Sequence, residues 1–146
     1  MSVEKYENYR EVSEHVRSKM GNISKTMLAG LLGVTERSLS DWEGRMIGQA
    51  TPKALRLELL FKVVLFLEKE FPKVPHNMYR EILDNSTFEF DNSDDEDGSI
   101  SLIGMIVADP KNQYWRSIVK NSVSEYLRYI EFKGDEVEQG RFVRRA

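Results

Sequence analysis

KTMLAGLLGVTERSLSDWEGR, residues 25–45, is the most informative segment of this chain. Ala29 and Gly33 place very small side chains where two short helices would meet at a tight turn. Leu39 and Trp42 are three residues apart, so they lie on one face of the second helix and can pack against the first. This pattern predicts a helix-turn-helix, two short helices joined by a turn that contains glycine.

The ends of the two helices can be predicted from the same stretch. Ser24 and Thr35 are residue types that cap helix N-termini, because their hydroxyl oxygens accept backbone N–H groups of the first turn. Gly44 is a residue type that ends helices. We therefore expect one helix over 25–32 and a second over 36–43.

The predicted second helix leaves one face exposed, and in helix-turn-helix proteins that face enters the major groove of DNA. Arg37 is the best candidate for a bidentate contact to guanine, because guanidinium matches the O6 and N7 acceptors. Double-stranded DNA is therefore the predicted partner. The predicted DNA-binding residues are Lys25, Thr26, Thr35, Glu36, Arg37, Ser38, Ser40, Asp41, Arg45, Lys53 and Arg56.

These residues are assigned different contacts. Glu36 is expected to accept from cytosine N4, whereas Thr35, Ser38 and Ser40 are expected to contact a phosphate or a base. Lys25 and Thr26 start the first helix and are expected to face the DNA backbone. Phosphate contacts at the flank are assigned to the three basic residues that follow: Arg45, Lys53 and Arg56.

The motif resembles the Xre/Cro-type helix-turn-helix family over about residues 20–62, and four pieces of sequence carry the likeness. They are Leu28-Ala29, Leu32-Gly33-Val34-Thr35, Ser38-Leu39 and Trp42-Glu43-Gly44. The resemblance implies a bundle of about four or five helices that binds a palindromic operator as a homodimer. The layout is also similar to that of Xre-type antitoxins, which implies autoregulation and a toxin-like protein partner.

The rest of the chain predicts an all-α protein with two parts and a tail. A helix-turn-helix domain is expected over 1–71, with further helices at 6–20 and 52–70. Thr51-Pro52 is a start signal, with Thr51 as the cap, and the broad apolar face of 52–70 is a candidate dimer interface.

A partner-binding or dimerisation region is expected over 72–133, followed by a flexible tail at 134–146. Its helices are predicted at 75–83 and 112–132. Residues 99–107 fit a helix somewhat better than a strand. If they form a strand, Thr87–Phe90 would pair with it in a small β-hairpin near 87–107.

Composition excludes several classes of protein. The net charge is −3 and there is no cysteine, so cysteine-based zinc sites and disulfides are excluded. The longest apolar run, Val63–Leu67, is far shorter than the roughly 20 residues of a membrane span. The charged N-terminus lacks the apolar segment of a signal peptide, so a cytoplasmic location is expected. No catalytic motif occurs, so we expect no enzyme activity, cofactor or metal.

Two other functions remain open at this point. Met1–Leu60 carries nine basic and eight acidic residues, and Glu36 and Asp41 lie on the predicted DNA-facing surface. This balance favours the alternative of a protein-interaction module, such as an antitoxin, immunity or adaptor protein, whose helix-turn-helix does not bind DNA. Glu81–Gly98, with eight acidic and no basic residues, could serve a basic partner. A weaker hypothesis is a regulator that binds a small molecule near 99–107.

Overall fold

The computed structural model describes residues 8–46, 51–89 and 99–145, and these residues are mostly helical. The elements are α1 (Tyr9–Lys19), α2 (Lys25–Leu32), α3 (Glu36–Glu43), α4 (Ala54–Glu70), a 3₁₀ turn (His76–Met78), α5 (Tyr79–Asn85), β1 (Thr87–Glu89), β2 (Ser99–Ser101), α6 (Leu102–Ala108) and α7 (Trp115–Arg145). The predicted all-α class is confirmed, with one short antiparallel pair of strands.

Local hydrogen bonds set the ends of the first three helices. Asn8 Oδ1 accepts from the Glu11 N–H (3.0 Å), Ser24 Oγ from the Met27 N–H (3.1 Å) and Thr35 Oγ1 from the Ser38 N–H (3.0 Å). The caps of α2 and α3 act over only three residues, so residue type alone predicts where these helices begin. The bounds of both helices agree with the prediction. The first helix begins at Tyr9 rather than residue 6, and positions 6 and 7 lie outside the described residues.

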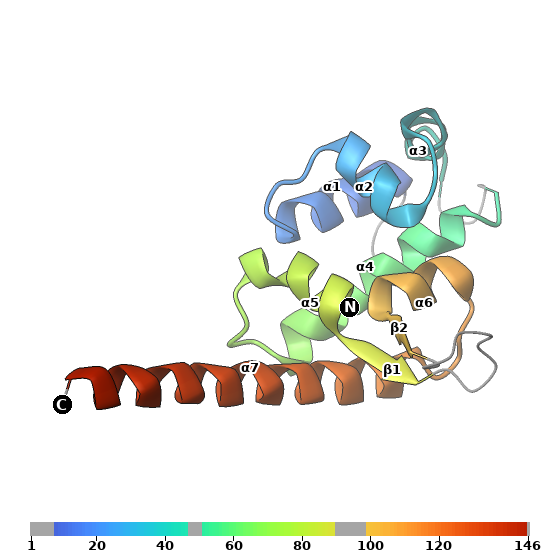
Figure 1. Ribbon diagram of the computed structural model, residues 1–146. Coiled ribbons are helices and arrows are strands. Elements are labelled where there is room, and N and C mark those ends of the chain that lie inside the picture. The colour runs from blue at the N-terminus through green and yellow to red at the C-terminus, as the bar shows by residue number, and fades with distance from the viewer. Residues whose placement is uncertain (1–7, 47–50, 90–98, 146) are drawn as a thin grey trace.

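Helix α4 lies at the centre of the molecule. It packs against α1, α6 and α7, and in Figure 1 it lies between α3 and α7. Nine of its side chains are buried, which is typical of a helix surrounded by others. The buried residues are Ala54, Leu57, Leu59, Leu60, Phe61, Val63, Val64, Leu65 and Leu67.

Two expectations about this helix are wrong. It begins at Ala54, and the Thr51 side chain does not cap it; the Thr51 carbonyl instead accepts from the Ala54 N–H at 2.9 Å. Its apolar face is not spare surface for a dimer, because α1, α6 and α7 of the same chain cover it.

Residues 99–107 begin as a strand and continue as a helix, so each of the two structures considered for this segment is present in part. Ser99–Ser101 forms β2 and pairs antiparallel with β1, with Phe88 opposite Ile100. Ser101 then caps α6, since its Oγ accepts from the Gly104 N–H at 3.0 Å. One serine therefore ends the strand and begins the helix, which periodicity alone could not show.

The last two predicted helices have different bounds in the structure. The segment expected as a helix from Pro75 forms a 3₁₀ turn first, and α5 follows it. Helix α7 begins at Trp115 and continues to Arg145, so the expected helix end at Phe132 is wrong, while the flexibility of 134–146 stays a prediction. Its C-terminal part extends beyond the body of the molecule (Figure 1).

Buried side chains form a single cluster that extends from Tyr9 to Val123. The cluster contains residues from both sides of the boundary expected at 71, because α6 packs against α2 and α4. No helix in the described ranges has the length and apolar content needed to cross a bilayer.

Two glycines of the helix-turn-helix give a matched stability test. Gly33 has φ +66°, and a Cβ there would lie 3.4 Å from Arg56 Nη1. Gly33→Ala should therefore lower the free energy of unfolding by about 1–2 kcal/mol. Gly30 lies within α2 with nothing within 4 Å of an added Cβ, so Gly30→Ala should raise it by about 0.5–1 kcal/mol. Urea unfolding measures both, and changes of the same sign would contradict this account.

Candidate nucleic-acid interface

The turn between α2 and α3 has the tight geometry predicted from Ala29 and Gly33. Gly33 adopts the left-handed conformation, and the Val34 N–H donates to the Ala29 carbonyl at 3.0 Å. Leu39 and Trp42, predicted to pack against the first helix, are buried, which confirms that α3 is held along one side. Leu28, Ala29 and Leu32 of α2 are buried as well, and Val34 in the turn is half-buried.

The opposite side of α3 is exposed. Glu36, Arg37, Ser40 and Asp41 are all solvent-accessible, as predicted. In Figure 1 this helix lies at an edge of the molecule, away from α7. Arg37 makes no hydrogen bond or ion pair with any residue that the structure describes, so its guanidinium can contact a ligand.

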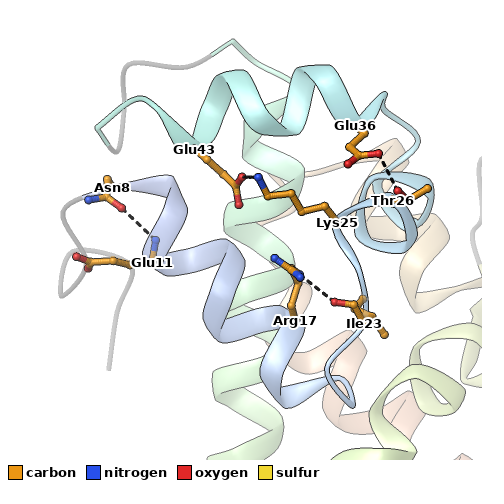
Figure 2. Close-up of polar contacts among 8 residues, drawn as sticks. All are labelled: Asn8, Glu11, Arg17, Ile23, Lys25, Thr26, Glu36 and Glu43. Atoms are coloured by element: carbon orange, nitrogen blue, oxygen red, sulfur yellow. Dashed lines mark hydrogen bonds and ion pairs between the residues drawn. The ribbon is translucent and has the colours of Figure 1, made fainter.

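Both acidic residues of the exposed α3 face have neighbours. The Thr26 hydroxyl donates to Glu36 Oε2 at 2.7 Å and joins the start of α2 to the start of α3 (Figure 2). Asp41 Oδ2 accepts from Arg45 Nε at 3.2 Å. The Arg45 guanidinium offsets the charge of Asp41, and Thr26 occupies one oxygen of Glu36. Arg37 is thus left as the cation of α3 available to a phosphate or a base.

Lys25 does not face solvent as a free phosphate contact. Its ammonium makes an ion pair with Glu43 Oε1, and Figure 2 shows the two side chains bridging α2 and α3. The side chain of Glu43 is 2% exposed, whereas that of Lys25 is 37% exposed. Within the protein its charge compensates a buried carboxylate, and the contact of Lys25 with the DNA backbone stays a prediction.

The three flanking cations lie in different environments. Arg56 is half-buried, and its Nη1 donates to the Leu32 carbonyl at 2.9 Å. It therefore caps the C-terminus of α2, where a cation also favours the helix dipole. Arg45 is exposed beside Asp41, and Lys53 is exposed at the start of α4. Of these three, Arg45 and Lys53 keep surface positions that suit phosphate contacts.

Thr35 and Ser38 interact with each other at the start of α3. Besides accepting the Ser38 N–H, Thr35 Oγ1 donates to Ser38 Oγ at 3.0 Å. Ser38 is half-buried and Thr35 is exposed. Their hydroxyls hold the N-terminus of the helix, and Ser40 one turn later is exposed.

Two polar contacts that the sequence did not indicate support this arrangement. Arg17 Nε donates to the Ile23 carbonyl at 2.9 Å, which joins the end of α1 to the loop before α2 (Figure 2). The Tyr9 hydroxyl donates to Glu58 Oε2 at 2.9 Å and links α1 to α4. Tyr9 and Glu58 are far apart in sequence and meet only when α1 packs on α4, whereas Arg17 and Ile23 meet across the turn that follows α1.

Two titratable side chains outside α2 and α3 have pKa values that are shifted by burial in the protein. Burial lowers the pKa of His15, whose ring lies edge-on to Phe61 and whose Nε2 is 3.3 Å from Glu68. Burial raises the pKa of Tyr79 to about 12. The described residues contain no group of three His, Asp or Glu side chains placed to hold a metal ion.

Two aromatic residues, Tyr114 and Tyr129, are 74% and 57% exposed. They are separated along the α7 direction by roughly 22 Å, at about 1.5 Å per residue. They are therefore exposed at separate places and do not form one aromatic patch.

Comparison with known proteins found no matching family model, no matching curated protein and no matching solved structure.

Proposed function

We propose that this protein is a sequence-specific DNA-binding transcription regulator of the Xre/Cro type, in which α3 enters the major groove. The observation that carries the proposal is the division of α3 into two faces. Leu39 and Trp42 are buried against the scaffold, while Arg37 is exposed and has no partner among the described residues. A recognition helix needs this combination of a fixed position and available base-contacting side chains.

The proposal includes a homodimer on a palindromic operator, because a single recognition helix contacts too few base pairs for specific affinity. It also includes autoregulation in the cytoplasm and modulation by a toxin-like protein partner, as the resemblance implies. The two copies would join through a surface other than the apolar face of α4, because other helices of the same chain cover that face.

Arg37→Ala should weaken binding to the preferred duplex by about 10- to 100-fold, because a bidentate contact to guanine contributes about 1–3 kcal/mol. The preferred duplex is selected from a random library of about 30 base pairs, and binding is measured by fluorescence anisotropy. Wild-type affinity should fall steeply between about 50 and 200 mM salt, since phosphate contacts release counterions.

Arg128→Ala is the matched control, because Arg128 is an exposed arginine on α7, far from α3. It should bind the selected duplex as the wild-type protein does. Equal loss in both variants would indicate a general charge effect, and no loss in Arg37→Ala would refute the assigned role. Selection of no duplex at about 50 mM salt would refute DNA binding altogether.

A groove on the other side of the molecule favours a second candidate function, a protein-interaction module. Glu81 and Glu125 line this groove together with Tyr126 and Tyr129, and the Tyr126 hydroxyl donates to Glu81 Oε1 at 3.0 Å. Carboxylates beside aromatic rings suit the lysine or arginine side chains of a basic partner. This function would stand alone if the duplex selection failed.

A further inference from the structure

A pocket of about 490 Å³ lies between the second half of α4 and the first turn of α7. Its size falls within the range of small-molecule sites, roughly 300–1,000 Å³. Since α4 lies between α3 and α7 in Figure 1, the pocket is remote from the proposed DNA-binding helix. It is also separate from the segment 99–107.

The floor of the pocket is aromatic. The Phe66 and Trp115 rings lie edge to face, with centroids 5.6 Å apart and an angle of 73° between them. Leu65 completes the apolar surface, and both Leu65 and Trp115 are largely buried. Phe66 is half-buried and keeps part of its ring accessible, so a flat apolar ring can contact it beside the buried Trp115.

The rim of the pocket carries three cations. Lys62 and Lys69 are seven residues apart on α4, so they share one face and lie on either side of Phe66. Arg116 extends over the Trp115 ring, with 4.7 Å between its guanidinium carbon and the ring centroid. None of the three makes an ion pair with a residue in the described ranges.

Two carboxylates also line the pocket but do not cancel this charge. Glu68 lies 3.3 Å from His15 and is 23% exposed, so its side chain is turned toward α1. Glu70 is exposed at the end of α4. Three cations against these two acids leave a positive excess, and the N-terminus of α7 adds the positive end of a helix dipole.

We propose that this pocket binds a small planar anion, an aromatic ring that carries a carboxylate or a phosphate. The ring would lie on Phe66 beside Trp115, and the anionic group would contact Lys62, Lys69 and Arg116. The cations and the aromatic floor are both needed, because either feature alone would favour a different ligand. The inference goes beyond DNA binding and does not depend on it.

Salicylate and phenyl phosphate are the probes, and isothermal titration calorimetry at physiological salt is the measurement. At least one should bind with a Kd below about 1 mM, and the tighter of the two tells a carboxylate ligand from a phosphate ligand. Neutral salicylamide should bind at least about tenfold more weakly than salicylate if the cations contribute. The Trp42→Phe protein keeps Trp115 as its sole tryptophan, so quenching of its fluorescence would place the probe at this pocket.

Lys62→Gln with Lys69→Gln should weaken binding about tenfold or more, and because both lysines are exposed the fold should persist. Arg10→Gln with Lys73→Gln removes two exposed cations elsewhere and should leave binding unchanged. Absence of binding by both anions, equal binding of salicylamide, or equal loss in the two double variants would overturn the proposal. The calorimetry contains no DNA, so its failure is distinct from failure of the duplex selection.

Discussion

Lys25→Met is expected to lower the free energy of unfolding by about 3 kcal/mol, a large effect for a residue on the surface of a short helix. The variant leaves the Glu43 carboxylate, 2% exposed, without the ammonium that compensates its charge. In the described part of the chain no other cation pairs with this carboxylate. Removing one partner of a buried ion pair costs about 3–5 kcal/mol, and the partial exposure of Lys25 favours the lower end.

Urea unfolding at neutral pH measures this loss, and two variants test its cause. Lys25→Met combined with Glu43→Met should recover most of the stability, because an apolar pair leaves no buried charge. Lys73→Met removes an exposed lysine outside the motif and should change stability by less than about 0.5 kcal/mol. If the double variant is as unstable as Lys25→Met, the loss does not come from the unpaired carboxylate.

Trp42→Ala should cost about 3–5 kcal/mol, because it removes the largest side chain that holds α3 to the scaffold. Trp42 is 2% exposed and belongs to the same cluster as Leu39 and Tyr9. Since Arg37 lies on the same helix, loosening of α3 should also abolish binding to the selected duplex. Thermal unfolding and the anisotropy assay measure the two effects.

Two further substitutions separate packing from surface chemistry. Trp42→Phe keeps an aromatic ring in the core and should cost less than Trp42→Ala. Ser40→Ala lies on the exposed face of α3 and should change stability by less than about 0.5 kcal/mol. A cost below about 1.5 kcal/mol for Trp42→Ala would contradict the clamped position of α3 on which the proposed function depends.

The predicted DNA-binding residues show how far sequence analysis extends. Arg37, Ser40 and Asp41 could be predicted to be exposed, because they lie on the side of a short helix opposite the buried Leu39 and Trp42. The structural roles of Lys25 and Arg56 could not. Their partners, Glu43 and the Leu32 carbonyl, are distant in sequence and come within reach only after the helices pack.

Interactions between residues three or four positions apart could be predicted from residue type alone. Ser24, Gly33 and Thr35 act on backbone groups of their own turns, so the bounds of α2 and α3 followed from residue type. Three features became clear only from the packed structure. The apolar face of α4 is covered by α1, α6 and α7, the strand β2 ends and α6 begins at Ser101, and α7 continues to Arg145. These features depend on which surfaces, distant from one another in sequence, pack together. A short segment of sequence contains only one of the two surfaces, so it cannot predict the free energy gained when they are buried.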